Sequence, residues 1–111
     1  METIAIIETI NYYAVEAKVV LENDQLIFST KPRWVRYVFG FVGVAIAPYK
    51  ERFKINLTDV ISVKFSKTMF GKPMCKIVYG YAKDYCYISF SSKDDDMVNE
   101  IKTKLKDVVI L

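Results

Sequence analysis

The side chains that most often perform catalysis are scarce in this chain. It contains no histidine, so a cysteine–histidine nucleophile is impossible. Two cysteines, Cys75 and Cys86, cannot by themselves complete a structural zinc site. No phosphate-cradling glycine loop, nucleophile elbow or paired acid–base group can be placed in the sequence. We therefore expect a non-enzymatic protein with no metal, no cofactor and no small-molecule substrate.

The densest group of carboxylates is the run Asp94-Asp95-Asp96. Three consecutive side chains on a helix point in three different directions, which argues against a shared metal ion. Negative charge in the first turn of a helix is instead favoured by the helix dipole. We interpret the run as the acidic start of a helix.

The most informative segment for binding is residues 34–47, which are fourteen residues with one charge. As a helix it would span about 21 Å, short of the ~30 Å hydrocarbon core of a bilayer. Its aromatic side chains would form a larger exposed patch than a soluble monomer usually carries. The domain's own sheet, a protein partner (most simply a second copy) or lipid must therefore cover it. The candidate interaction residues are Trp34, Tyr37, Phe39, Phe41, Arg33 and Arg36.

Basic residues flank this segment and could face an anionic membrane or a phosphate group. The candidates are Lys31, Lys50, Arg52 and Lys54. The nearby Asn23-Asp24 turn carries no basic side chain, which disfavours a specific phosphoinositide site. A net charge of +3 is too small to indicate nucleic acid, so no nucleic-acid partner is expected.

Alternation of apolar and polar residues predicts the strands that would position these groups. In residues 60–66 the period places Ile61, Val63 and Phe65 on one face. Residues 3–10 are apolar and β-branched, which fits either a strand or a short helix. The other predicted strands are residues 14–22, 25–30, 51–57, 60–66, 74–80 and 85–91.

The tyrosines near residue 80 predict an aromatic surface. Tyr85 and Tyr87 alternate with the core-facing Cys86, Ile88 and Phe90, so they should point outward, with Tyr79 and Tyr81 across the hairpin. Such pairs stabilise a sheet surface, and the alternative is a protein-binding face.

After residue 91 the hydrophobic period changes from two to 3.6. Met97, Ile101, Leu105 and Val108 form one apolar stripe, which predicts a helix with Ser92 as its N-cap. Lysines at 102, 104 and 106 suit the negative end of the helix dipole.

Length and composition indicate one domain spanning residues 1–111, with residues 34–47 as an apolar insert. The first ten residues contain no Lys or Arg and do not resemble a secretory signal. We expect a cytoplasmic protein with reduced cysteines, with the inner membrane surface as the alternative location.

Three stretches resemble parts of bacterial pleckstrin-homology-like (PH-like) and GRAM-like domains. They are LENDQLIFSTK (21–31), FKINLTDVISVKF (53–65) and YCYISFSSKDDDMVNEIKTKL (85–105). The resemblance implies an α+β, mainly β fold: a bent antiparallel sheet or partly open barrel of seven strands, capped by one C-terminal helix. It also implies a non-enzymatic module, since such domains bind phosphoinositides, proteins or copies of themselves.

These observations lead to one hypothesis and one alternative. The hypothesis is a PH-like interaction module that binds protein partners or itself, as a homodimer, through residues 34–47. The alternative is a peripheral module that binds anionic lipid through the same segment and its flanking Lys and Arg residues.

Overall fold

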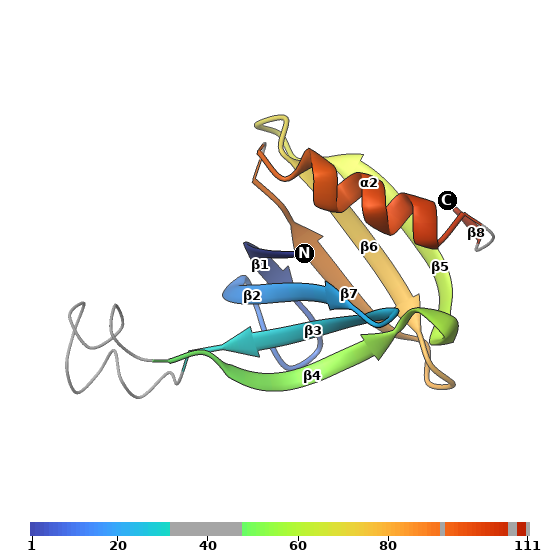
Figure 1. Cartoon of the computed structure of the whole chain (residues 1–111), viewed down its shortest axis with the longest axis horizontal. Coiled ribbons are helices and arrows are strands. Elements are labelled where there is room, and N and C mark those ends of the chain that lie inside the picture. Colours follow the sequence, from blue (N-terminus) through green and yellow to red (C-terminus); the bar gives the residue numbers. More distant parts are fainter. Residues whose placement is uncertain (32–47, 92, 107–108, 111) are drawn as a thin grey trace.

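The computed structural model describes residues 1–31, 48–91, 93–106 and 109–110 (Figure 1). The candidate interaction residues Arg33, Trp34, Arg36, Tyr37, Phe39 and Phe41 lie outside the described residues. So do the expected N-cap Ser92 and the last residue of the predicted stripe, Val108.

The described chain forms one eight-stranded sheet and one α-helix. Seven antiparallel strands precede the helix, as the sequence predicts. The first apolar run forms a strand, Glu2–Glu8, rather than a helix. An eighth, two-residue strand follows the helix and was not predicted. The elements are β1 (Glu2–Glu8), β2 (Val15–Glu22), β3 (Gln25–Thr30), β4 (Lys50–Asn56), the 3-10 turn η1 (Leu57–Asp59), β5 (Val60–Lys67), β6 (Pro73–Tyr79), β7 (Asp84–Ser89), α2 (Asp95–Lys104) and β8 (Val109–Ile110).

The strands lie in the order β4-β3-β2-β1-β7-β6-β5-β8, so the sheet has two edges and does not close into a barrel. Neighbouring strands are antiparallel except for the β5–β8 pair, which is parallel. The sheet bends strongly between its two halves, and α2 lies across β5 and β6 (Figure 1).

The turn between β2 and β3 confirms the predicted hairpin. Asn23 and Asp24 have φ angles of +49° and +58°, the left-handed conformation that a two-residue hairpin turn requires. The carboxylate of Asp24 also forms an ion pair with Lys104 Nζ at 2.9 Å, which joins this turn to the end of α2.

The apolar stripe of α2 packs into the core as predicted. Met97, Ile101 and Leu105 are buried, together with Val98. The N-cap of α2 is Asp94, the first residue of the aspartate run, and not the predicted Ser92. Its carboxylate accepts hydrogen bonds from the hydroxyl of Thr3 at 2.8 Å and from the backbone N–H of Ser91 at 3.1 Å. The first aspartate therefore ties the start of the helix to β1.

One face assignment was wrong, because β5 contains a bulge. The register with β6 shifts between Val60 and Ser62, and such a shift moves the residues before it to the other face. Val60 is consequently buried, whereas Ile61 is 44% exposed. Val63 lies in the core and Phe65 packs against it, as predicted.

This difference can be tested with two matched truncations. Ile77→Ala removes a fully buried side chain from β6 and should lower the free energy of unfolding by about 2–5 kcal/mol. Ile61→Ala should cost less than about 1 kcal/mol, since half-exposed side chains lose little on truncation. Urea unfolding of the full chain measures both values. Equal losses would contradict the assigned bulge.

Candidate functional site

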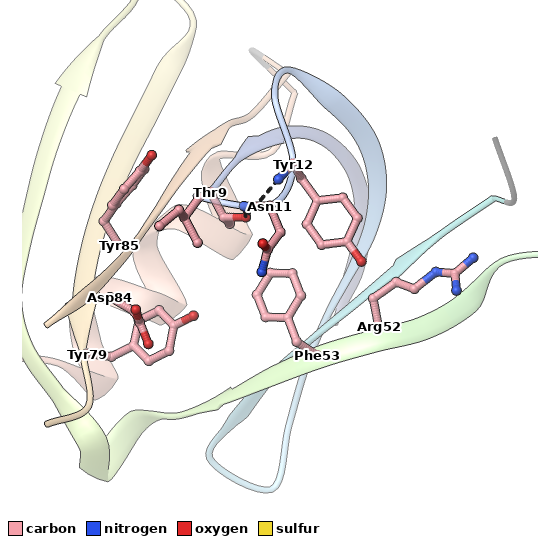
Figure 2. Close-up of a pocket in the computed structure, with 9 residues that line it drawn as sticks. Thr9, Asn11, Tyr12, Arg52, Phe53, Tyr79, Asp84 and Tyr85 are labelled. Carbon is pink, nitrogen blue, oxygen red and sulfur yellow. Dashed lines mark hydrogen bonds between the residues drawn. The ribbon is translucent and has the colours of Figure 1, made fainter. Parts of the chain in front are cut away.

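A pocket of about 220 Å³ lies where the β1–β2 loop, β4 and the β6–β7 hairpin meet (Figure 2). The loop provides four of its lining residues, and the strands provide the rest. The lining residues are Thr9, Ile10, Asn11, Tyr12, Arg52, Phe53, Tyr79, Asp84 and Tyr85.

Thr9 holds the β1–β2 loop in shape. Its hydroxyl oxygen accepts hydrogen bonds from the backbone N–H groups of Asn11 and Tyr12, both at 3.2 Å. Its own N–H donates to the carbonyl of Tyr12 at 2.6 Å. Ala14, which ends the loop, has a φ of +49°, a conformation that costs a non-glycine residue about 1–2 kcal/mol. Local hydrogen bonds therefore fix Asn11 and Tyr12 at the pocket wall.

A bulge between β3 and β4 brings Arg52 to this pocket. Phe28 pairs with Phe53 and Ser29 pairs with Glu51, so Arg52 is the extra residue with no partner across the ladder. Strict alternation along residues 51–57 would place Arg52 and Phe53 on opposite faces, but with the bulge both line the pocket. The guanidinium Nε donates to the hydroxyl of Thr30, which is buried, at 2.9 Å.

Phe53 connects the pocket to the core through stacked rings. Its ring centroid lies 4.6 Å from that of Phe28 at an interplanar angle of 11°. On the other side it lies 6.0 Å from the ring of Tyr12 at 21°. Phe28 is fully buried, so the stack anchors the pocket wall against motion.

Tyr79 forms the facing wall. It is the last residue of β6, packs against the core cluster and pairs in register with Asp84. Burial raises the pKa of its phenol, and the nearby Cys86 and Asp84 raise it further. Figure 2 shows the rings of Tyr79 and Phe53 pointing into the pocket, whereas the ring of Tyr85 points away from them.

The tyrosine surface differs from the predicted one. Tyr85 and Tyr87 lie opposite Val78 and Lys76, not opposite Tyr79 or Tyr81. Their rings meet edge to face at 5.6 Å, and Lys76 Nζ lies 5.3 Å from the ring of Tyr87. Tyr79 shares the core face of β6 with Cys75 and Ile77, while Tyr81 is fully exposed in the β6–β7 turn. The alternation of Tyr85 and Tyr87 with the buried Cys86 and Ile88 is confirmed. The expected partners across the hairpin were wrong, because Tyr79 pairs with Asp84 and lies on the core face.

The predicted basic candidates do not gather at one point. Lys31 Nζ lies 5.1 Å from the ring of Tyr49, beyond the end of β3. Lys50 and Lys54 are exposed on β4. Of these described cations, Arg52 alone lines the pocket.

The two cysteines are buried, as predicted for Cys86. They lie on adjacent strands, where Cys75 pairs with Ile88 and Cys86 pairs with Ile77. Burial raises the pKa of each thiol to about 12. The thiolate that would act as a nucleophile is therefore strongly disfavoured at neutral pH.

Sequence reasoning missed most of the pocket. The sequence placed Asn11 and Tyr12 between two predicted strands, and Asp84 in a predicted hairpin turn. The available signal was the two polar residues Thr9 and Asn11 at the end of the first apolar run. That this segment meets Phe53 and Tyr79 depends on the bend of the sheet.

Comparison with known proteins adds no relationship: no family model matches the chain, and a search of curated proteins gives no match. The described part of the chain contains no helix with the length and apolarity needed to cross a bilayer. The described residues also contain no group of three or more metal-ligating side chains.

Proposed function

We propose that this chain is a non-enzymatic, PH-like interaction module that binds protein partners, including copies of itself. The observation that carries this proposal is the composition of the pocket: Arg52 and three tyrosines line it beside the ring of Phe53. Arginine and tyrosine are enriched among the residues that dominate binding energy at protein interfaces.

The size of the pocket favours a protein ligand. Its volume of about 220 Å³ is below the range of about 300–1,000 Å³ typical of small-molecule sites. One anchoring side chain of a partner matches it better than a whole cofactor does.

Exposed apolar side chains belong to the pocket lining or follow it closely in the sequence. Ile10 is 77% exposed, Tyr13 81% and Tyr81 fully exposed. Ile10 lines the pocket, Tyr13 lies in the same β1–β2 loop, and Tyr81 lies in the turn between the lining residues Tyr79 and Asp84. Apolar and aromatic side chains around a recess are the usual core of a protein interface.

The architecture is compatible with the PH-like part of the proposal. Seven antiparallel strands followed by a C-terminal helix is the arrangement that the sequence resemblance implies. Because one fold supports many functions, the fold favours an interaction module without selecting its ligand.

Residues 34–47 supply the second proposed contact, on sequence grounds. On the β3 side the chain leads toward the segment from Thr30, which accepts a hydrogen bond from the pocket residue Arg52. We propose that Trp34, Tyr37, Phe39 and Phe41, with Arg33 and Arg36, mediate self-association.

Self-association can be tested by light scattering on the full chain. We expect a mass at least twice that of the monomer, and a folded monomer for the double variant Phe39→Ser/Phe41→Ser, because serine removes the apolar contact area. Thermal unfolding of the variant checks its fold. A monomeric wild-type protein, or a variant that unfolds, would contradict this mode of self-association.

A second candidate function is peripheral binding to an anionic membrane, through residues 34–47 and the flanking Lys31, Lys50, Arg52 and Lys54. One described feature favours it. Met69 and Phe70, at the tip of the β5–β6 hairpin, are 89% and 86% exposed, and exposed lysines 67 and 72 flank them. Apolar side chains among cations suit insertion into an anionic lipid surface.

Sedimentation with vesicles that contain anionic lipid tests this candidate. Binding at low salt should weaken with added salt, and Met69→Ser/Phe70→Ser should reduce it without unfolding the domain. Recovery of the wild-type protein in the supernatant at low salt would exclude membrane binding.

A further inference from the structure

We propose that the pocket binds a cationic side chain of the partner, a lysine or arginine, with its charge at Asp84 and its alkyl stem between Phe53 and Tyr79. That a protein supplies this cation rests on the function proposed above. The preference for a cation rests on the pocket alone.

Asp84 offers the charge that such a ligand needs. Within the described chain its carboxylate accepts no hydrogen bond and forms no ion pair. Figure 2 shows it beside the ring of Tyr79, inside the pocket. A cation at this point would form a charge-assisted contact with a carboxylate that has no competing partner.

The two facing rings supply a second attraction. Phe53 and Tyr79 point into the pocket from opposite strands (Figure 2), and the face of an aromatic ring attracts a cation within about 6 Å. Both rings are held from behind, Phe53 by its stack on Phe28 and Tyr79 by the core cluster. Little ordering of these side chains is needed on binding, which favours affinity.

An anionic ligand fits the same space less well. Arg52 is the one basic residue of the lining, and it donates to Thr30. Its guanidinium points away from Asp84 in Figure 2. The β1–β2 loop, residues 9–14, contains no lysine or arginine. An anion in the pocket would be repelled by Asp84 and would lack a surrounding set of cations. Arg52, at the rim, can instead form an ion pair with an acidic residue next to the bound side chain.

The test is an NMR titration of the ¹⁵N-labelled full chain with n-butylammonium chloride, which imitates a lysine side chain. We expect saturable shifts at the amides of Asp84, Tyr79 and Phe53. The neutral molecule of similar length, 1-butanol, should leave them unchanged. Inorganic phosphate serves as the anionic probe and should not produce the same shifts.

Variants separate the contributions. Asp84→Asn should weaken butylammonium binding about tenfold or more, because it removes the charge but keeps the shape. Asp95→Asn, on the exposed start of α2, is the control of equal charge and should have no effect. Phe53→Leu should weaken binding about threefold, since it removes the aromatic face. It also provides a second test if Asp84→Asn disturbs the fold.

The outcomes distinguish the two proposals. Equal shifts from butylammonium and 1-butanol, or undiminished binding by both Asp84→Asn and Phe53→Leu, would overturn the cation site. Phosphate binding that depends on Arg52, without butylammonium binding, would do the same. The chain could bind butylammonium but neither self-associate nor bind a lysine-containing peptide. That result would support the cation site and contradict the proposed protein partner.

Discussion

The apolar face of a bent antiparallel sheet cannot be left in water, and in this molecule one short helix covers it. Met97, Val98, Ile101 and Leu105 of α2 are buried with the inward-facing residues of the strands in one continuous cluster. A ten-residue helix is marginal on its own, so α2 and the sheet depend on each other. The contacts of Asp94 with Thr3 and of Lys104 with Asp24 fix the two ends of the helix against the sheet.

The residues of the candidate pocket come together largely where the regular pairing of strands is interrupted. The bulge opposite Phe28 and Ser29 moves Arg52 beside Phe53, and the β1–β2 loop departs from strand geometry to present Asn11 and Tyr12. At the same end of the sheet, the β6–β7 turn places Asp84 beside Tyr79. A small pocket with a carboxylate, aromatic faces and a guanidinium at its rim follows from these irregular positions.

The sequence predicts the regular parts of this fold well. Alternation identified most of the strands, whereas residues 3–10 were left open between a strand and a helix. Asn23-Asp24 marked the hairpin turn, and the stripe of Met97, Ile101 and Leu105 identified the helix and its buried side. These features are local, so the signals lie within about ten residues of each other. Strand β8 was missed because two residues are too few to show an alternation of apolar and polar side chains. Its pairing with β5 is also a contact between residues far apart in the sequence.

Two departures from strict alternation share one physical cause. A bulge reverses which face of the sheet the neighbouring residues occupy, without a marked change in composition. The bulges in β4 and β5 place Arg52 and Ile61 on faces that strict alternation does not predict. The pocket could not be assembled from the sequence, because Thr9, Phe53 and Tyr79 meet only after the sheet bends. Residues 34–47 remain the strongest sequence signal for an interface, and the described pocket adds a second one near the points where that segment joins β3 and β4.

Amide hydrogen exchange tests most directly whether α2 is the cover on which the fold depends. If it is, the protected amides of α2 should exchange with the same free energy of opening as those at the centre of β6 and β7, because the helix is exposed only when the whole domain unfolds. If the α2 amides exchange orders of magnitude faster than those strands, the helix opens independently and does not hold the sheet together.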